Sequence, residues 1–189
     1  MNRVHLIRHG KPAAAWGDDD ADPGLDETGR AQARAVAETL MALPPAERPT
    51  FVVSSPLKRC QETASPLAEA LGVPVLIDPA VGEIPTPAGL TQAQRPDWLR
   101  KAMAGDWSGI KGDIDYGQWR AAVARSVASH ANGAVFSHFV AINGVVSLVR
   151  GDDRVIVFRP DHTSHTTLDV GEAGLSLVRL GPEAVTTVT

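Results

Sequence analysis

Five side chains that could do chemistry follow apolar runs of this 189-residue chain: Arg8, His9, Arg59, Glu83 and His138. The runs at 4–7, 51–53, 73–77 and 134–137 are short and bounded by polar or turn-forming residues, which is typical of buried strands. In an open sheet of parallel strands, ligands bind beyond the carboxyl ends of the strands. We therefore expect these side chains to converge at one edge of a sheet.

Two arginines and two histidines at one edge would suit the transfer of a phosphoryl group. A phosphate monoester is a dianion at neutral pH, and its transferring group spreads charge over three oxygens, so catalysis needs positioning and positive charge. Arg8 and Arg59 are the expected clamps, because a guanidinium matches phosphate oxygens in bidentate geometry and keeps its proton. The same cations disfavour protonation of His9, which leaves a neutral imidazole to act as the nucleophile.

The other two groups have roles in holding oxygen and moving protons. His138 would hold a phosphoryl oxygen, and Glu83, if burial raises its pKa, would protonate the leaving oxygen and later deprotonate water. Asp106 is the reserve candidate for the acid, because it lies in the same segment between strands. Lys11 either contacts the phosphate or faces water. The alternative roles are a capping or core histidine for His138 and an ordinary loop carboxylate for Glu83.

The elements that position these residues alternate between strand and helix. Periodic apolar residues and end signals such as Asp26, Ser55-Pro56 and Gly72 predict helices over 27–41, 55–71, 91–103, 116–130 and 140–149. Further strands are expected over 155–158, 166–170 and, at an edge, 175–180. This alternation predicts an α/β fold, a three-layer αβα sandwich with a mainly parallel sheet.

Composition narrows the class of protein. A length of 189 residues with 43% apolar content fits one domain over 1–189, with a substrate-facing insertion at about 78–115 that is rich in Pro, Gly and polar residues. The net charge of −4 argues against nucleic acid and anionic membrane partners, so a small molecule or a protein is the expected substrate. Cys60 is the only cysteine, and no apolar leader follows Met1, so we expect the cytoplasm.

Metal binding is the main alternative use of the histidines. His5 and His9 are four residues apart, but in a strand that spacing separates them by about 13 Å, too far for one ion. Asp161, His162 and His165 could form a ligand cluster, but a polar turn before a strand is the favoured interpretation. We therefore expect no metal and no obligatory cofactor.

Two motifs together resemble the histidine phosphatase superfamily, which includes the phosphoglycerate mutase-like enzymes. The segment LIRHG at 6–10 resembles its Arg-His-Gly signature, and SSPLKRCQETA at 54–64 resembles its second motif in order and spacing. The segment LDETGRAQA at 25–33 looks like the helix between them, and the resemblance resumes at 136–138. It implies that His9 is phosphorylated, that Arg8, Arg59 and His138 form the phosphate pocket, that Glu83 is the proton donor, and that the mixed sheet has six strands.

The chain departs from the family pattern at two places. Phe139 follows His138 where the family commonly has a small residue, and Gly82-Glu83-Ile84 matches the third motif by position alone. Hydrolysis of phosphomonoesters through phospho-His9 is the favoured function. The alternatives are a mutase, which usually has a longer chain and a larger insertion, a protein phosphohistidine phosphatase, and a silent phosphate-binding module. The partner would be a small phosphorylated metabolite or a phosphoprotein, and the chain a monomer or a homodimer.

Overall fold

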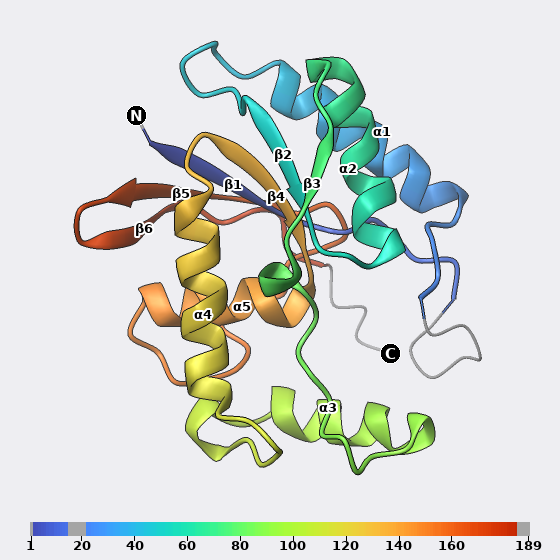
Figure 1. The fold of residues 1–189 in the computed structure, drawn as a ribbon, viewed down its shortest axis with the longest axis vertical. Helices are drawn as coiled ribbons and strands as arrows, with labels where there is room; N and C mark the ends of the chain where they lie inside the picture. The colour runs from blue at the N-terminus through green and yellow to red at the C-terminus, as the bar shows by residue number, and fades with distance from the viewer. Residues whose placement is uncertain (1, 15–21, 185–189) are drawn as a thin grey trace.

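A six-stranded mixed sheet lies at the centre of the computed structural model, which describes residues 2–14 and 22–184 (Figure 1). The strand order is β3-β2-β4-β1-β5-β6. The strands are β1 (Arg3–Arg8), β2 (Phe51–Ser54), β3 (Val75–Ile77), β4 (Gly133–Ser137), β5 (His165–Gly171) and β6 (Gly174–Arg179). β3, β2, β4 and β1 run parallel to one another, whereas β5 is antiparallel to both β1 and β6. The predicted α/β fold with a mainly parallel sheet is confirmed.

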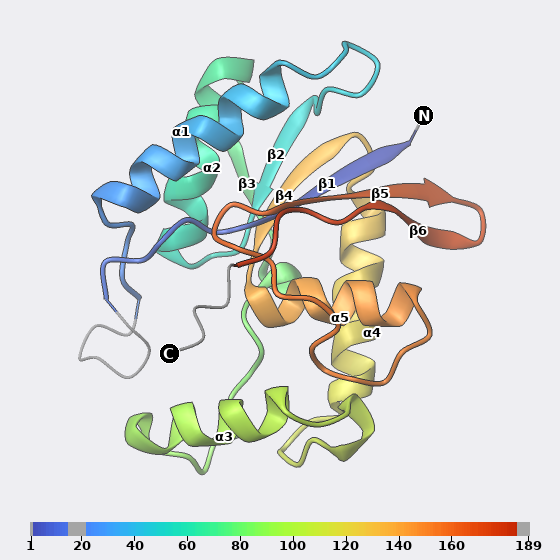
Figure 2. The same cartoon turned by 180° about the vertical axis from the view of Figure 1, so that it is seen from behind.

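Helices cover both faces of this sheet. Helices α1 (Glu27–Met41) and α2 (Lys58–Leu71) lie on one face, and α4 (Tyr116–Ser129) and α5 (Phe139–Val149) lie on the other (Figures 1 and 2). Each face has its own buried cluster, because successive side chains of a strand point to opposite sides. Leu6 packs into the cluster under α4 and α5, and Ile7 into the cluster under α1 and α2. The three-layer arrangement is therefore confirmed.

The register of the parallel strands brings their carboxyl ends together. Arg8 of β1 is paired with Ser137 of β4, so His9 and His138 are the next residues on two neighbouring strands. Ser54 of β2 is paired with Phe136, which brings the start of the β2–α2 loop to the same edge. The segments that follow β1, β2 and β4 therefore begin side by side at the same edge of the sheet.

Helix α1 holds the segment that follows β1 by a close backbone contact. Asp26 caps the helix, and its Oδ1 accepts a hydrogen bond from the backbone N–H of Gly29 at 2.7 Å. Gly29 lies against the chain at Gly10 and Lys11, so closely that a Cβ on Gly10 would meet the Gly29 carbonyl oxygen at 2.8 Å. Glycine is required here because two backbones touch, not because of an unusual torsion angle.

The expected start of α2 is wrong. Ser55 and Pro56 do not open the helix: α2 begins at Lys58, and its N-cap residue, Leu57, makes no side-chain cap bond. The Ser55 hydroxyl lies 2.8 Å from Nε2 of His138 and accepts only a long hydrogen bond, 3.4 Å, from the N–H of Leu57, so its closer partner is at the sheet edge. The predicted end is confirmed, because Gly72 adopts the left-handed conformation with φ of 68°.

The expected strand at 155–158 is also wrong. This segment is buried and apolar, but the backbone N–H groups of Val157 and Phe158 donate to the side-chain carbonyl of Asn143 on α5 at 2.9 and 3.2 Å. An apolar run with this composition does not reveal whether its hydrogen-bond partner is a strand or a side chain. The strand beside β1 is instead β5, which begins at His165.

The segment at 78–115 packs on the far end of the α4 and α5 layer. It contains α3 (Arg95–Met103) and the short 3-10 turns Pro79–Val81, Gln92–Gln94 and Trp107–Gly109, and Figure 1 shows α3 apart from the sheet. Its buried residues join those of α5 and of the following loop in one cluster: Ile84, Leu99, Trp107, Tyr116, Val140 and Val155. This separate apolar cluster anchors the segment that carries Glu83.

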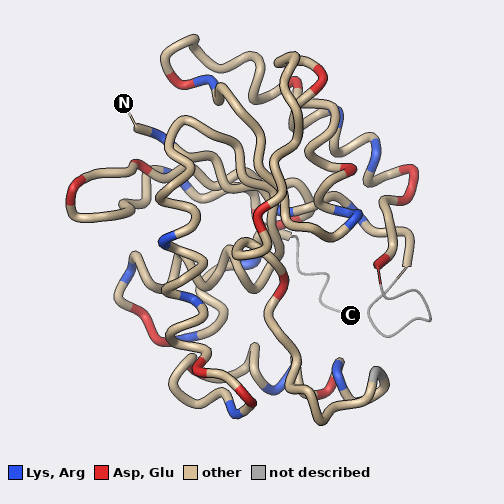
Figure 3. The backbone as a smooth tube through the Cα atoms, in the orientation of Figure 1, with Lys and Arg blue, Asp and Glu red and all other residues tan. Residues whose placement is uncertain are grey.

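Charged residues of both signs are distributed along the whole backbone (Figure 3). This distribution agrees with the small net charge of −4. No helix in residues 2–14 and 22–184 is long and apolar enough to cross a bilayer.

We predict that Gly29→Ala destabilises the protein, although alanine ordinarily favours a helix over glycine by about 1 kcal/mol. The new Cβ would overlap the carbonyl oxygen of Lys11, which is backbone and cannot rotate away. We expect a loss of about 2 kcal/mol in the free energy of unfolding, measured in urea. Gly117→Ala in α4 is the control, because the only nearby atom there is Asp115 Oδ1 at 3.2 Å. Equal or greater stability of Gly29→Ala would show that the contact is loose.

Candidate active site

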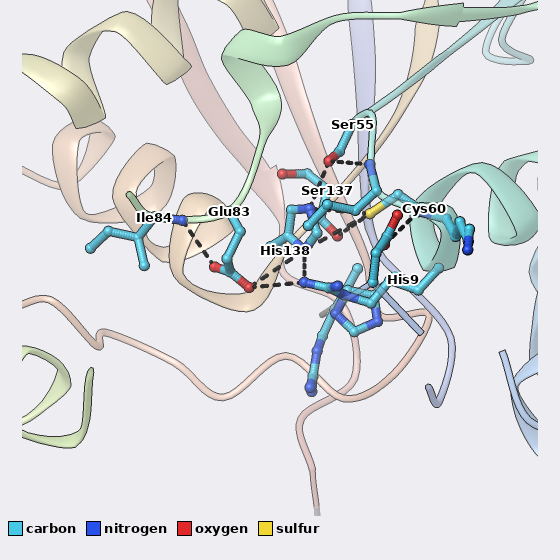
Figure 4. A network of polar contacts seen from close by, with 12 residues as sticks. His9, Ser55, Cys60, Glu83, Ile84, Ser137 and His138 are labelled. Carbon is cyan, nitrogen blue, oxygen red and sulfur yellow. Dashed lines mark hydrogen bonds and ion pairs between the residues drawn. The ribbon is translucent and has the colours of Figure 1, made fainter. Parts of the chain in front are cut away.

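His9 lies directly after β1, and its environment fixes which ring nitrogen can react (Figure 4). Nδ1 lies 2.8 Å from the carbonyl oxygen of Gly10. A carbonyl oxygen only accepts, so Nδ1 carries the proton and donates it to this bond. The lone pair of the neutral ring is therefore on Nε2.

Backbone contacts hold the His9 segment from two sides. The N–H of His9 donates to the carbonyl of Ser137 on β4 at 3.0 Å. The N–H of Gly10 donates to the hydroxyl of Thr63 on α2 at 2.9 Å. Together with the contact to Gly29, these bonds fix the imidazole on a rigid edge of the sheet.

The surroundings of His9 keep it neutral. Burial has the largest effect and lowers the pKa of His9 well below its ordinary value, and the positive charges of Arg59 and Arg8 lower it further. The bond to the Gly10 carbonyl raises the pKa, but its effect is smaller than that of burial or of Arg59. At neutral pH the ring is therefore uncharged and lies between fixed cations.

The Arg8 side chain contacts Pro160, His162 and Phe139, and its Nε is not used in any of these contacts. Its Nη1 donates to the carbonyl of Pro160 at 2.9 Å, and its guanidinium carbon lies 5.1 Å from the centre of the Phe139 ring. Phe139, the departure from the family pattern, thus supports the cation through its ring face. The buried Nε of Arg8 has no hydrogen-bond partner among residues 2–14 and 22–184. A buried unpaired donor next to His9 is suited to an anionic ligand.

Arg59, on the first turn of α2, connects the other two groups. Its Nη2 lies 3.2 Å from Nδ1 of His138 and 3.5 Å from Oε2 of Glu83. Because a guanidinium only donates, Nδ1 of His138 accepts, and the proton of the neutral ring is on Nε2. Nε2 then donates to the hydroxyl of Ser55 at 2.8 Å.

His138 is fully buried and neutral in this arrangement. Burial lowers the pKa of His138 well below its ordinary value, and nearby His9 and Arg59 lower it further. The sulfur of Cys60 lies 3.4 Å from Nε2 on the side of α2. The contact of 3.5 Å between Nδ1 of His138 and Oε2 of Glu83 is therefore not an ion pair in the free site.

Glu83 follows the turn Pro79–Val81 and reaches the same edge from the other side. Its side chain is 8% exposed, and its Oε1 accepts a hydrogen bond from the N–H of Ile84 at 3.1 Å. Burial raises the pKa of Glu83, and the nearby Arg59 partly offsets this increase. A buried carboxyl group with a raised pKa is suited to donating a proton near neutral pH.

The structure brings together all five predicted site residues but not the reserve residues. Asp106 is exposed, and its backbone forms an isolated bridge with Arg154. Lys11 pairs with Asp26 at 2.7 Å, with its side chain 53% exposed. Trp107, in the same segment, is 2% exposed and donates to Ser147 at 2.9 Å, so it is a core residue.

Two other tryptophans, Trp98 and Trp119, pack beside aromatic rings. Trp98 is half-buried and donates to the carbonyl of Lys111 at 3.3 Å, beside the ring of Tyr116. Trp119 packs partly buried against Trp107, with ring centres 5.9 Å apart. Trp16 lies outside the described residues.

The histidines considered as metal ligands are used in other ways. Nδ1 of His5 and Nε2 of His165 are 2.7 Å apart, forming a buried imidazole pair on β1 and β5. Burial lowers the pKa of His165 to about 3, with a contribution from His5. In residues 2–14 and 22–184 no group of three His, Cys, Asp or Glu side chains is arranged to hold a metal ion.

His162 is a site residue that sequence reasoning missed. Its ring centre lies 6.0 Å from that of His9, and its Nε2 lies 3.3 Å from Nη2 of Arg8. The sequence suggested His162 only as a possible metal ligand or as part of a polar turn before a strand, and did not predict what that turn lies beside. Once β5 is paired antiparallel to β1, the turn before β5 falls beside Arg8, and that pairing is the signal that would have found it.

The site at the carboxyl edge of the sheet combines a neutral histidine, two arginines and a buried carboxyl group. This combination is the one expected for phosphoryl transfer through a histidine. The family model of the histidine phosphatase superfamily (branch 1) matches residues 4–182. The chain belongs to this superfamily.

Individual relatives are similar over part of the chain. One is the transcription factor tau 55 kDa subunit of Saccharomyces cerevisiae, 33% identical over 107 residues, which are 47% of this chain and 24% of that protein. Another is the glucosyl-3-phosphoglycerate phosphatase of Mycolicibacterium vanbaalenii, 31% identical over 113 residues, 58% of this chain and 40% of that protein. The match thus spans less than half the length of both relatives.

Solved structures are similar over nearly the whole chain. A structure described as mycobacterial hydrolase 1 has 25% sequence identity and a TM-score of 0.70, covering 97% of this chain and 99% of that one.

We predict that Arg59→Ala weakens the binding of inorganic phosphate by about 100-fold, or about 2.7 kcal/mol, measured by calorimetry. Removal of a cation also favours the protonated imidazole, so the pKa of His9 rises in an NMR titration. Arg34→Ala on the exposed face of α1 is the matched control and should change neither quantity. Unchanged phosphate affinity in Arg59→Ala would show that Arg59 serves only Glu83 and His138.

Proposed function

We propose that this chain is a phosphatase that hydrolyses phosphomonoesters in two steps through a phosphohistidine on His9. The observation that carries the proposal is the lone pair on Nε2 of His9, held neutral between Arg8 and Arg59 with the buried Glu83 nearby. The phosphatase relative from Mycolicibacterium vanbaalenii supports hydrolysis.

In the first step, Nε2 of His9 forms a bond to phosphorus while the bond from phosphorus to the ester oxygen breaks. Glu83 gives its proton to the leaving oxygen, so the product departs as a neutral alcohol. Arg8, Arg59 and His138 bind the equatorial oxygens, which carry the developing charge.

In the second step, water attacks the phosphorus of phospho-His9. The Glu83 carboxylate accepts a proton from the water, an oxygen–phosphorus bond forms, and the nitrogen–phosphorus bond breaks. His9 and Glu83 return to their starting states, and inorganic phosphate leaves. Neither step as written uses a metal ion or a cofactor.

The proposal also covers the domain organisation, the location and the substrate of the protein. We place the whole chain, 1–189, in one domain, with the segment at 78–115 facing the substrate, and we place the protein in the cytoplasm. The substrate is a small phosphorylated metabolite, a choice that the phosphatase relative supports. Hydrolysis is preferred over mutase activity because the insertion is short.

We predict that His9→Ala abolishes hydrolysis of p-nitrophenyl phosphate measured in the presence of a chelator. The reason is that the unprotonated nitrogens of His138 and His162 accept from Arg59 and Arg8, whereas Nε2 of His9 keeps a lone pair to attack phosphorus. His130→Ala is the matched control, because His130 is half-buried on another part of the chain, where it contacts Asp78.

A labelling experiment on the wild-type protein tests the phosphohistidine intermediate. Brief exposure of the wild-type protein to labelled substrate should leave acid-labile, base-stable phosphate on His9. A silent phosphate-binding module would give no turnover above the His9→Ala level, and label on a serine would refute the phosphohistidine.

We predict that Glu83→Gln lowers kcat/KM more for alkyl phosphates than for aryl phosphates. An alkoxide is a poor leaving group and needs the proton, so we expect a loss of about 1000-fold for the alkyl ester and about tenfold for p-nitrophenyl phosphate. Asp106→Asn and Glu69→Gln, both changes of exposed carboxylates, should leave both values unchanged. Equal losses for the two esters would assign the proton donor elsewhere.

A further inference from the structure

The turn at 160–164 is bonded to the backbone of the catalytic segment. The N–H of Arg8 donates to the carbonyl of Ser164 at 3.1 Å, and the N–H of Thr163 donates back to the carbonyl of Arg8 at 3.1 Å. The carbonyl of Pro160 accepts from Nη1 of Arg8 at 2.9 Å. The turn therefore holds both the main chain and the side chain of Arg8.

Thr163 adopts a conformation that is costly for its side chain. Its φ is 58°, in the left-handed region that a β-branched residue rarely occupies. Such strain persists where the surroundings over-determine it, often at functional sites. Here the two bonds to Arg8 and the bond from Ser164 N–H to the Asp161 carbonyl, at 2.9 Å, fix the turn.

The result of this turn is that His162 lies beside both Arg8 and His9. Nε2 of His162 is 3.3 Å from Nη2 of Arg8, and its ring centre is 6.0 Å from that of His9. A guanidinium only donates, so Nε2 of His162 accepts, and the remaining proton of the ring is on Nδ1. Nδ1 faces Oδ1 of Asp161 at 3.8 Å.

We propose that His162 is a positioning residue, which holds the Arg8 guanidinium through its Nε2 so that the buried Nε of Arg8 is presented to the phosphate. Pro160 and His162 use one hydrogen on each terminal nitrogen of Arg8, and Phe139 covers its face. The fork is thereby fixed in rotation. This inference rests on the proposed function, because it assigns Arg8 to the phosphate.

The charge state of His162 agrees with this role. Burial lowers the pKa of His162 to about 4, Arg8 lowers it as well, and Asp161 and Asp26 act in the opposite direction, while Lys11 lowers it slightly. The ring is therefore neutral at pH 7 and can accept from Arg8. Its side chain is 25% exposed, so its replacement need not disturb the core.

The test is a double-mutant cycle with inorganic phosphate as the probe, measured by calorimetry. We expect His162→Ala to weaken phosphate binding by about tenfold. His162→Gln should stay within about twofold of the wild-type protein, because the glutamine carbonyl can accept near the position of Nε2. His130→Ala is the matched control, since its ring is 21% exposed and bonded to Asp78, and it should bind phosphate as the wild type does.

The cycle is closed in the Arg8→Lys background, which keeps the charge and measurable affinity but loses the fork. If His162 acts through the Arg8 fork, His162→Ala causes no further loss there. A further tenfold loss would instead make His162 a direct phosphate ligand and overturn the proposal. So would wild-type affinity in His162→Ala, or a glutamine variant as weak as the alanine variant.

Thermal unfolding of each variant separates this role from a loss of folding, and the glutamine variant keeps the test decisive if the alanine variant is unstable. Phosphate binding does not require turnover. Absence of hydrolysis with an intact cycle would refute the proposed function alone, whereas hydrolysis without coupling would refute the role of His162 alone.

Discussion

A buried site that contains two guanidinium groups disfavours a charged imidazole, and the chemistry of this sheet edge depends on that constraint. Burial and the cations together hold His9 and His138 in their neutral forms. Neutral rings have one acceptor and one donor nitrogen, so each partner determines a tautomer. The Gly10 carbonyl leaves the lone pair of His9 on Nε2, and Arg59 leaves the proton of His138 on Nε2. One electrostatic condition thus leaves His9 with an available lone pair and makes His138 a member of a hydrogen-bonded network.

The fold satisfies this constraint through backbone contacts. The parallel register of β1 and β4 places His9 next to His138 before any side chain is considered. Gly29 lets α1 approach the chain at Gly10, and the hydroxyl of Thr63 holds the same residue from α2. On the opposite side, the turn at 160–164 is bonded to the main chain of Arg8. The backbone that carries Arg8 and His9 is thereby held in place. Electrostatic catalysis needs groups that are positioned before the substrate binds.

The sequence predicted the site residues better than the details of the loops that join them. Strand-end logic and two motifs predicted that Arg8, His9, Arg59, Glu83 and His138 lie together, and the structure brings them to one edge because apolar runs and parallel topology determine where strands end. The helix cap at Ser55 was wrong because serine can serve a helix end or a neighbouring imidazole, and only the tertiary structure decides. The strand at 155–158 was wrong because Asn143 satisfies that backbone. The position of His162 beside Arg8 was missed because it depends on which strand pairs with β1.

A phosphate dianion would change the contacts that Arg59, His138 and Glu83 make with one another. Arg59 now donates to Nδ1 of His138 and approaches Glu83, while the Nε of Arg8 has no partner in the described ranges. A phosphate dianion placed between the arginines would take hydrogen bonds from both of them, which removes the donor from Nδ1 of His138. The negative charge also raises the pKa of that imidazole, because an adjacent anion favours the charged form. Nδ1 can then gain a proton and donate to a phosphoryl oxygen while Nε2 keeps its bond to Ser55. A bound dianion would therefore allow His138, which is neutral beside the two arginines, to become a third cation.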